Sequence, residues 1–154
     1  MKDTSKNTGA SSGKGRERQR FFTVEEANAR LPLVRAITED MVELASDFVD
    51  RKQRLEALLE NRKPTAKDAY SEELVEMQKT LERDSQRLRG YARELQELGV
   101  EPKGAMEGLV DFPAWVDGRE VCLCWRLGEA EVLFWHELEA GFAGRQPLVA
   151  SAVQ

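Results

Sequence analysis

The stretch LVDFPAWVDGREVCLCWRLGEAEVLFW, residues 109–135, decides the fold class because it combines apolar segments with two turn signals. Asp117-Gly118 favours a two-residue β-hairpin turn, and Gly128-Glu129 suits a turn that needs glycine first. We therefore predict three short strands, which are listed here by number: 109–112, 120–126 and 131–135. Together they form a small three-stranded antiparallel β-meander within residues 107–136.

Two long amphipathic segments precede the meander. In each segment apolar residues recur at steps of three and four, a spacing typical of one helical stripe and of coiled coils. The first stripe contains Val34, Ile37, Met41, Leu44, Phe48, Leu55 and Leu58, and the second contains Tyr70, Leu74, Met77, Leu81, Leu88, Tyr91, Leu95 and Leu98. A short connection would fold the two segments into an antiparallel helical hairpin over residues 24–98. The predicted fold class is α+β, a long antiparallel α-helical hairpin followed by the meander.

Local signals predict where these helices begin and end. Thr23 and Glu26 form a capping-box pattern at the start of the first helix. Gly99 is suited to end the second helix in a left-handed conformation. Pro32 lies close behind the first cap, and proline breaks a helix interior, so we expect a kink or a restart there.

Each apolar stripe has one polar gap, at Arg51 in the first helix and at Asp84 in the second. The two positions face each other if the hairpin folds back near residues 65–66. We hypothesise that Arg51 and Asp84 form a polar layer that sets the register of the helices. The alternative is that both side chains point separately into water.

The first 20 residues differ in charge from the rest of the chain. They contain six Lys or Arg and two Asp or Glu, a net charge of +4, whereas the remaining residues carry a net charge of −9. We expect residues 1–20 to be a disordered basic tail, which could also touch an anionic surface. Because the body is acidic, we predict no nucleic-acid partner. One domain at 21–148, with an exit loop at 137–148 and a C-terminal tail at 149–154, completes the expected organisation.

The sequence contains no apolar run long enough for a membrane span or for the core of a secretory signal. We therefore predict no membrane association and a cytoplasmic location. Cys122 and Cys124 fit that compartment as free thiols. Residues two apart on a strand are about 6.5–7 Å apart, which is too far for a disulfide.

The two turns set a trial register for the meander, with Phe112 opposite Leu123 and Cys124 opposite Leu133. One face is then apolar and is expected to pack on the helices: Val110, Phe112, Val121, Leu123, Trp125, Val132 and Phe134. The other face mixes charges, thiols and aromatic rings: Leu109, Asp111, Trp115, Glu120, Cys122, Cys124, Arg126, Glu131, Leu133 and Trp135. A bulge at Pro113 would flip the residues on one side of it.

The mixed face could be covered by the C-terminal segment, could self-associate, or could bind a ligand or partner. The candidate interface consists of Trp115, Cys124, Leu133 and Trp135. A second group forms a candidate ligand or anion site near the hairpin end and the exit loop: Asp111, Arg126, Glu129, Glu131, His136 and Arg145. Glycines frame the turn before Arg145, so its amides and guanidinium could hold an anion, or Arg145 could pair with a carboxylate.

Cysteine and histidine are zinc ligands, so Cys122, Cys124 and His136 resemble part of a metal site. The trial register, however, places His136 on the opposite face of the sheet from both cysteines. The sequence also lacks a second pair of closely spaced cysteines. We therefore predict no metal and no cofactor. The same register separates His136 from Cys124 and so argues against a cysteine nucleophile; no catalytic residue is assigned.

Four segments together resemble one known family. They are RFFTVEEANARLPLV at 20–34, GLVDFP at 108–113, GREVCLCWRLGE at 118–129 and FWHELEAGFAGRQPL at 134–148. These motifs resemble the small prokaryotic proteins catalogued as domain of unknown function 2203, over essentially residues 21–148. The resemblance implies no activity, ligand or catalytic residue. In the family pattern position 122 is commonly a bulkier apolar or aromatic residue, so Cys122 departs from it.

The leading expectation is a non-enzymatic cytoplasmic protein that self-associates or docks a protein partner of unknown identity. The helical hairpin and the face with Trp115 and Trp135 would supply the contact surface. The alternative is a small-molecule binding or catalytic domain with its site near the hairpin end and the exit loop. That alternative requires His136, Arg126 and Arg145 to converge on one pocket.

Overall fold

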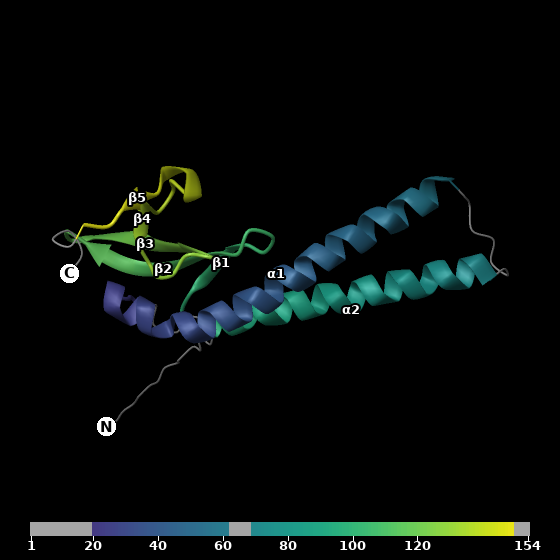
Figure 1. Ribbon diagram of the computed structural model, residues 1–154, viewed down its shortest axis with the longest axis horizontal. Helices are drawn as coiled ribbons and strands as arrows, with labels where there is room; N and C mark the ends of the chain where they lie inside the picture. The colour runs from purple at the N-terminus through teal and green to yellow at the C-terminus, as the bar shows by residue number, and fades with distance from the viewer. Residues whose placement is uncertain (1–19, 62–68, 150–154) are drawn as a thin grey trace, which may run out of the picture.

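Figure 1 shows a computed structural model of the chain, which describes residues 20–61 and 69–149. The elements are α1 (Val24–Asn61), α2 (Ala69–Glu97), β1 (Glu101–Gly104), β2 (Leu109–Val116), β3 (Arg119–Arg126), β4 (Phe134–Glu137), the 3-10 turn η1 (Phe142–Gly144) and β5 (Gln146–Pro147). The structure confirms the predicted α+β class. The expected connection between the helices, and almost all of the two expected tails, lie outside the described residues.

The two predicted helix boundaries next to the sheet are confirmed by their caps. The amide of Thr23 donates to Glu26 Oε1 at 2.9 Å, and the amide of Glu26 donates to Thr23 Oγ1 at 3.1 Å, which completes the capping box. At the end of α2, Gly99 has φ 89°, and the amide of Val100 donates to Leu95 O at 3.1 Å. This arrangement is a Schellman cap, which satisfies the last carbonyls of the helix.

Pro32 lies inside α1, which is one continuous helix of 38 residues. The expected restart is therefore wrong. Figure 1 shows the first turns of α1 inclined to the rest of the helix, as expected when proline removes a backbone donor and crowds the preceding turn.

The sheet packs on only one half of the hairpin, as Figure 1 shows. The core between them contains Ala27, Leu31, Val34, Ile37 and Met41 of α1, Leu95 of α2, and Val110, Phe112, Ala114, Val116, Val121, Leu123 and Trp125 of the sheet. Phe22 closes this core against Phe112, with the ring centroids 5.3 Å apart in an edge-to-face arrangement. The other half of the hairpin, residues 44–61 and 69–87, extends beyond the sheet. We call it the distal hairpin.

Arg51 and Asp84 join the two helices within the distal hairpin. Arg51 Nη1 lies 2.7 Å from Asp84 Oδ2, and Arg87 Nη1 lies 3.6 Å from the other carboxylate oxygen. Asp84 is buried, whereas Arg51 is exposed. The hypothesised pairing across the hairpin is therefore present, and the alternative that both side chains point separately into water is wrong.

The sheet has five antiparallel strands in the order β1-β2-β3-β4-β5, rather than the three predicted. β1 occupies the segment that was expected to be a turn, and β5 lies within the expected exit loop. Neither has the alternating apolar pattern of a strand: β1 reads EPKG and β5 contains two residues. Both form by hydrogen bonding to a neighbouring strand, and such pairing leaves no local signal in sequence.

The predicted register between β2 and β3 is confirmed, with Phe112 opposite Leu123. Asp117 and Gly118 both have positive φ, as a type I′ hairpin turn requires. Pro113 causes no bulge, because the pairing is continuous from Leu109 to Val116. The carbonyl of Pro113 accepts from Phe22 N at 2.8 Å, so this residue's backbone polar groups point away from β3 and its missing N–H breaks no bond of that ladder.

The predicted register between β3 and β4 is wrong by one residue: Cys124 lies opposite Phe134 rather than Leu133. The cause is the connection, since residues 127–133 form a loop fixed to α1 rather than a two-residue turn. Val132 N donates to Asn28 Oδ1 at 2.7 Å, and Arg35 Nη2 donates to Ala130 O at 3.2 Å. A shift of one residue turns every side chain of a strand to the opposite face. β4 therefore carries its residues on the faces opposite to those predicted.

In the described part of the chain, neither helix is long and apolar enough to cross a membrane.

Candidate functional site

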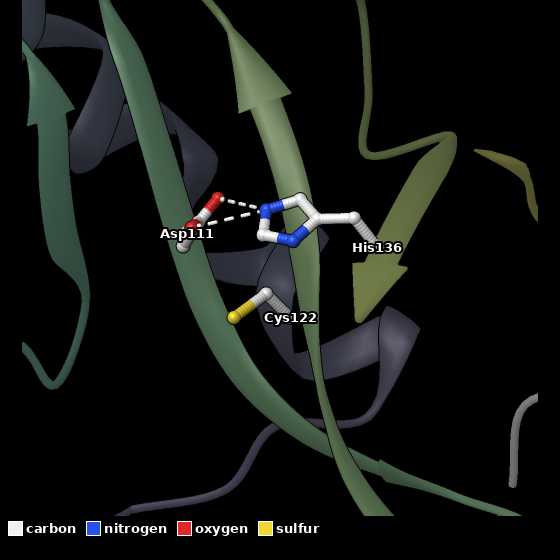
Figure 2. A group of neighbouring side chains, drawn as sticks. All are labelled: Asp111, Cys122 and His136. Atoms are coloured by element: carbon white, nitrogen blue, oxygen red, sulfur yellow. Dashed lines mark hydrogen bonds and ion pairs between the residues drawn. The ribbon is translucent and has the colours of Figure 1, made fainter. Parts of the chain in front are cut away.

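The face of the sheet that looks away from the helices, called here the outer face, contains a buried cluster of polar side chains. Asp111 of β2 lies opposite Cys124 of β3, and His136 of β4 lies opposite Cys122 of β3. Side chains of one face alternate along each strand, so these four residues share the outer face. Figure 2 shows Asp111, Cys122 and His136 pointing toward one another from three neighbouring strands.

The closest contact in this cluster joins Asp111 and His136. The Nε2 atom of His136 lies 3.1 Å from each of the two carboxylate oxygens of Asp111. Both side chains are almost completely enclosed, with Asp111 4% exposed and His136 2% exposed. Buried polar groups of this kind cost free energy unless they are paired, so the two residues satisfy each other.

The other ring nitrogen of His136 sets the tautomer. Nδ1 lies 2.7 Å from the backbone carbonyl oxygen of Glu137. A carbonyl oxygen can only accept a hydrogen bond, so Nδ1 carries a hydrogen and donates it. Nε2 is consequently the nitrogen directed at Asp111, and either a proton or a metal cation must lie between it and an ionised carboxylate.

Both thiols of the cluster are held in the neutral form. Burial raises the pKa of Cys122 and of Cys124 to about 12, and the nearby charge of Asp111 raises each further in the same direction. Each thiol also hydrogen bonds to the Asp111 carboxylate. In the metal-free protein the thiols are therefore hydrogen-bond donors and weak nucleophiles at neutral pH.

Arg145 forms a second group on the outer face, next to Cys124. Its Nη2 donates to Glu129 Oε1 at 2.9 Å and to the carbonyl oxygen of Cys124 at 3.3 Å. The guanidinium carbon lies 3.9 Å from the ring centroid of Phe134 and 4.6 Å from that of Phe142. The C-terminal segment thus covers the Cys124 end of the outer face, and Arg145 is neutralised by a carboxylate of its own chain.

The structure therefore distributes the predicted ligand-site residues over two separately paired groups. Asp111 pairs with His136, and Arg145 pairs with Glu129. The exposed Arg126 joins the second group through its amide, which donates to Glu129 Oε1 at 2.9 Å. Glu131 is exposed in the loop before β4. Within the described residues no hydrogen bond or ion pair joins the two groups, so His136, Arg126 and Arg145 do not form the single site that the alternative function requires.

The predicted interface residues are also separated. Trp115 is 48% exposed and lies against Phe21, with ring centroids 5.3 Å apart. Leu133 is 45% exposed in the loop, whereas Cys124 is buried. Trp135 faces the helices and packs against the core, because of the shifted register. The predicted Trp115/Trp135 face is thus wrong as one continuous surface.

The same shift corrects the placement of His136. The prediction that His136 lies on the face opposite the cysteines is wrong, since it lies directly across from Cys122. A Cys-x-Cys pair followed by a single histidine was the available signal. Recognising it required the strand register, which the sequence pattern alone set incorrectly.

A family model described as "Uncharacterized conserved protein (DUF2203)" matches residues 20–148 of the chain. No curated protein and no solved structure matches it.

Proposed function

The chain belongs to the DUF2203 family of uncharacterized conserved proteins, and we propose that it is a non-enzymatic protein that self-associates through its distal hairpin. The observation that carries this proposal is an apolar groove of about 260 Å³ between the two helices. The groove is lined by Phe48, Lys52, Leu55, Glu56 and Leu59 of α1 and by Gln78, Leu81, Glu82 and Ser85 of α2. It lies on the half of the hairpin that the sheet leaves uncovered.

A two-helix unit buries only part of each apolar stripe. Leu59 at the groove is 38% exposed, and Val75 of α2 is also exposed. Two further helices packed against such a pair would complete a four-helix bundle with a closed core. The unsatisfied apolar surface of the distal hairpin is the physical reason to expect a helical partner there.

A second copy of this chain is the occupant that the charges favour. The groove carries both signs of charge, with Lys52 on α1 and Glu82 on α2. Neither residue makes an ion pair within the described part of the chain. A two-fold interface requires a self-complementary surface, and two antiparallel copies would bring Lys52 of each toward acidic residues of the other.

The test is sedimentation velocity over a range of protein concentrations, applied to the full chain and to Leu59→Lys. We expect a concentration-dependent dimer that Leu59→Lys converts to monomer, because the substitution places a charge in the apolar groove. Leu133→Lys is the matched control, since Leu133 has similar exposure but lies on the loop before β4. It should leave the dimer unchanged.

Three other outcomes would refute the proposal. A monomer at all concentrations rejects self-association. A dimer that survives Leu59→Lys rejects the groove as its interface. A dimer that is lost in Leu133→Lys or in Trp115→Lys assigns the contact to the sheet instead. Circular dichroism of each variant confirms that its helices are intact.

A further inference from the structure

The buried cluster of the outer face has the composition and geometry of a metal site. We propose that Asp111, Cys122 and His136 bind one divalent transition-metal ion, with zinc as the natural candidate. A carboxylate oxygen, the Cys122 sulfur and a ring nitrogen of His136 all lie within 4.8 Å of one another. This inference does not depend on the distal hairpin, which lies on another part of the fold.

The spacing of the donor atoms suits a single ion. Zinc bonds of about 2.0–2.3 Å at tetrahedral angles place neighbouring ligand atoms about 3.3–3.6 Å apart. His136 Nε2 and the Asp111 oxygens are already 3.1 Å apart, and small side-chain rotations would bring the Cys122 sulfur to the same spacing. The three ligands come from three adjacent strands, so the hydrogen-bonded sheet holds them in place.

The hydrogen bond from His136 Nδ1 to Glu137 O supports the same conclusion independently. A histidine that binds a metal through one nitrogen typically donates the other N–H to a carboxylate or a backbone carbonyl. Here the 2.7 Å bond to Glu137 O fixes the ring orientation and leaves Nε2 directed at Asp111. A metal cation between Nε2 and the carboxylate would satisfy both groups.

The identity of the ligands selects the class of metal. Thiolate and imidazole prefer zinc, cobalt and similar ions, whereas calcium and magnesium prefer oxygen ligands. Three protein ligands would leave a fourth position for water or a small ligand. Cys122 is partly exposed while Asp111 and His136 are buried, so an ion would enter past the Cys122 thiol.

Cobalt(II) provides a direct probe, because a thiolate ligand gives an intense charge-transfer absorption in the near ultraviolet. The full chain, reduced and freed of metal with a chelator, would be titrated with Co²⁺ and then with Zn²⁺. We expect one Co²⁺ per chain with a thiolate band, and displacement of that band by one equivalent of Zn²⁺. The chain has one histidine and two cysteines, so few competing soft sites exist.

Two matched serine variants decide which thiol binds. Cys122→Ser should abolish the band and weaken Zn²⁺ binding by more than about 100-fold, beyond the effect of losing an outer partner of a ligand. Cys124→Ser, two residues along the same face, should retain the band. His136→Gln should also lose it, and circular dichroism would show whether that buried substitution still folds; Cys122→Ser, at a partly exposed position, decides the outcome if it does not.

Three results would overturn the proposal. The first is the absence of a thiolate band at several equivalents of Co²⁺. The second is a band that persists in Cys122→Ser. The third is loss of the band in a folded Cys124→Ser, which would show that the ligand set is not the one assigned.

Discussion

The Nε2 atom of His136 lies 3.1 Å from both carboxylate oxygens of Asp111, across the intervening strand β3. Both residues are enclosed, and the Asp111 carboxylate also accepts hydrogen bonds from two thiols. A single buried carboxylate thus organises the polar groups of three strands. Its removal should affect the stability of the sheet as well as any ion that the cluster holds.

Asp111→Asn should lower the free energy of unfolding of the metal-free protein by about 1.5–3 kcal/mol, the usual contribution of hydrogen bonds to a charged group. The amide keeps the shape of the side chain but loses the charge that His136 faces. Urea unfolding measures the change. In a double-mutant cycle with His136→Gln the two effects should not add, because the residues contact each other. Additive effects would contradict a direct interaction.

Arg51→Ala should cost more stability than removal of its buried partner. Without Arg51, the Asp84 carboxylate stays buried with only Arg87 at 3.6 Å, and an undercompensated buried acceptor costs about 1–3 kcal/mol. Asp84→Leu instead continues the apolar stripe and should be neutral or stabilising, since buried ion pairs often yield little net stability. Thermal unfolding followed by circular dichroism gives both values. A larger loss for Asp84→Leu than for Arg51→Ala would show that the pair itself supplies the stability.

Gly108→Ala should destabilise the fold by about 2–4 kcal/mol, because two costs combine. Gly108 has φ +70°, and a Cβ there would lie 2.7 Å from the Cβ of Leu127. Gly118→Ala is the control: its φ is +79°, but nothing lies within 4 Å of the added atom. It should cost only about 1–2 kcal/mol, from backbone conformation alone. Equal losses in urea unfolding would mean that the contact with Leu127 relaxes freely.

Arg145→Lys should loosen the C-terminal segment while leaving the hairpin unchanged. Lysine keeps the charge but loses the planar group between Phe134 and Phe142, a contribution of about 1–2 kcal/mol. Hydrogen exchange of the Leu148 amide, which donates to Leu133 O at 2.9 Å, should then accelerate about 5–30-fold.

The Val100 amide at the end of α2 provides the internal reference for this experiment, since its bond to Leu95 is remote from Arg145 along the chain. Its exchange should not change. Acceleration at both amides would indicate global destabilisation instead of local opening.

Much of the helical part could be predicted because its signals are local. The capping box at Thr23 and the glycine cap at Gly99 depend on residues within one helical turn. The pairing of Arg51 with Asp84 could be inferred as well, since two stripes of known spacing in a hairpin leave few possible registers. Pro32 was the exception: tertiary packing of α1 against the sheet outweighed the tendency of proline to end the helix.

The candidate site could not be predicted, although all of its residues were visible in the sequence. Its assembly depends on whether Cys124 pairs with Leu133 or with Phe134, a difference of one residue. The choice is made by the loop before β4, which is held by Asn28 of α1, more than 100 residues away in sequence. No local pattern reports such a contact.

The sequence by itself determined the α+β class, the two helices with their caps, and the hairpin between β2 and β3, because each rests on interactions between residues close along the chain. Only the tertiary structure decided the five-stranded sheet and the meeting of Asp111, Cys122 and His136 on one face. Side chains alternate with a period of two along a strand, so a single long-range anchor selects which residues share a face.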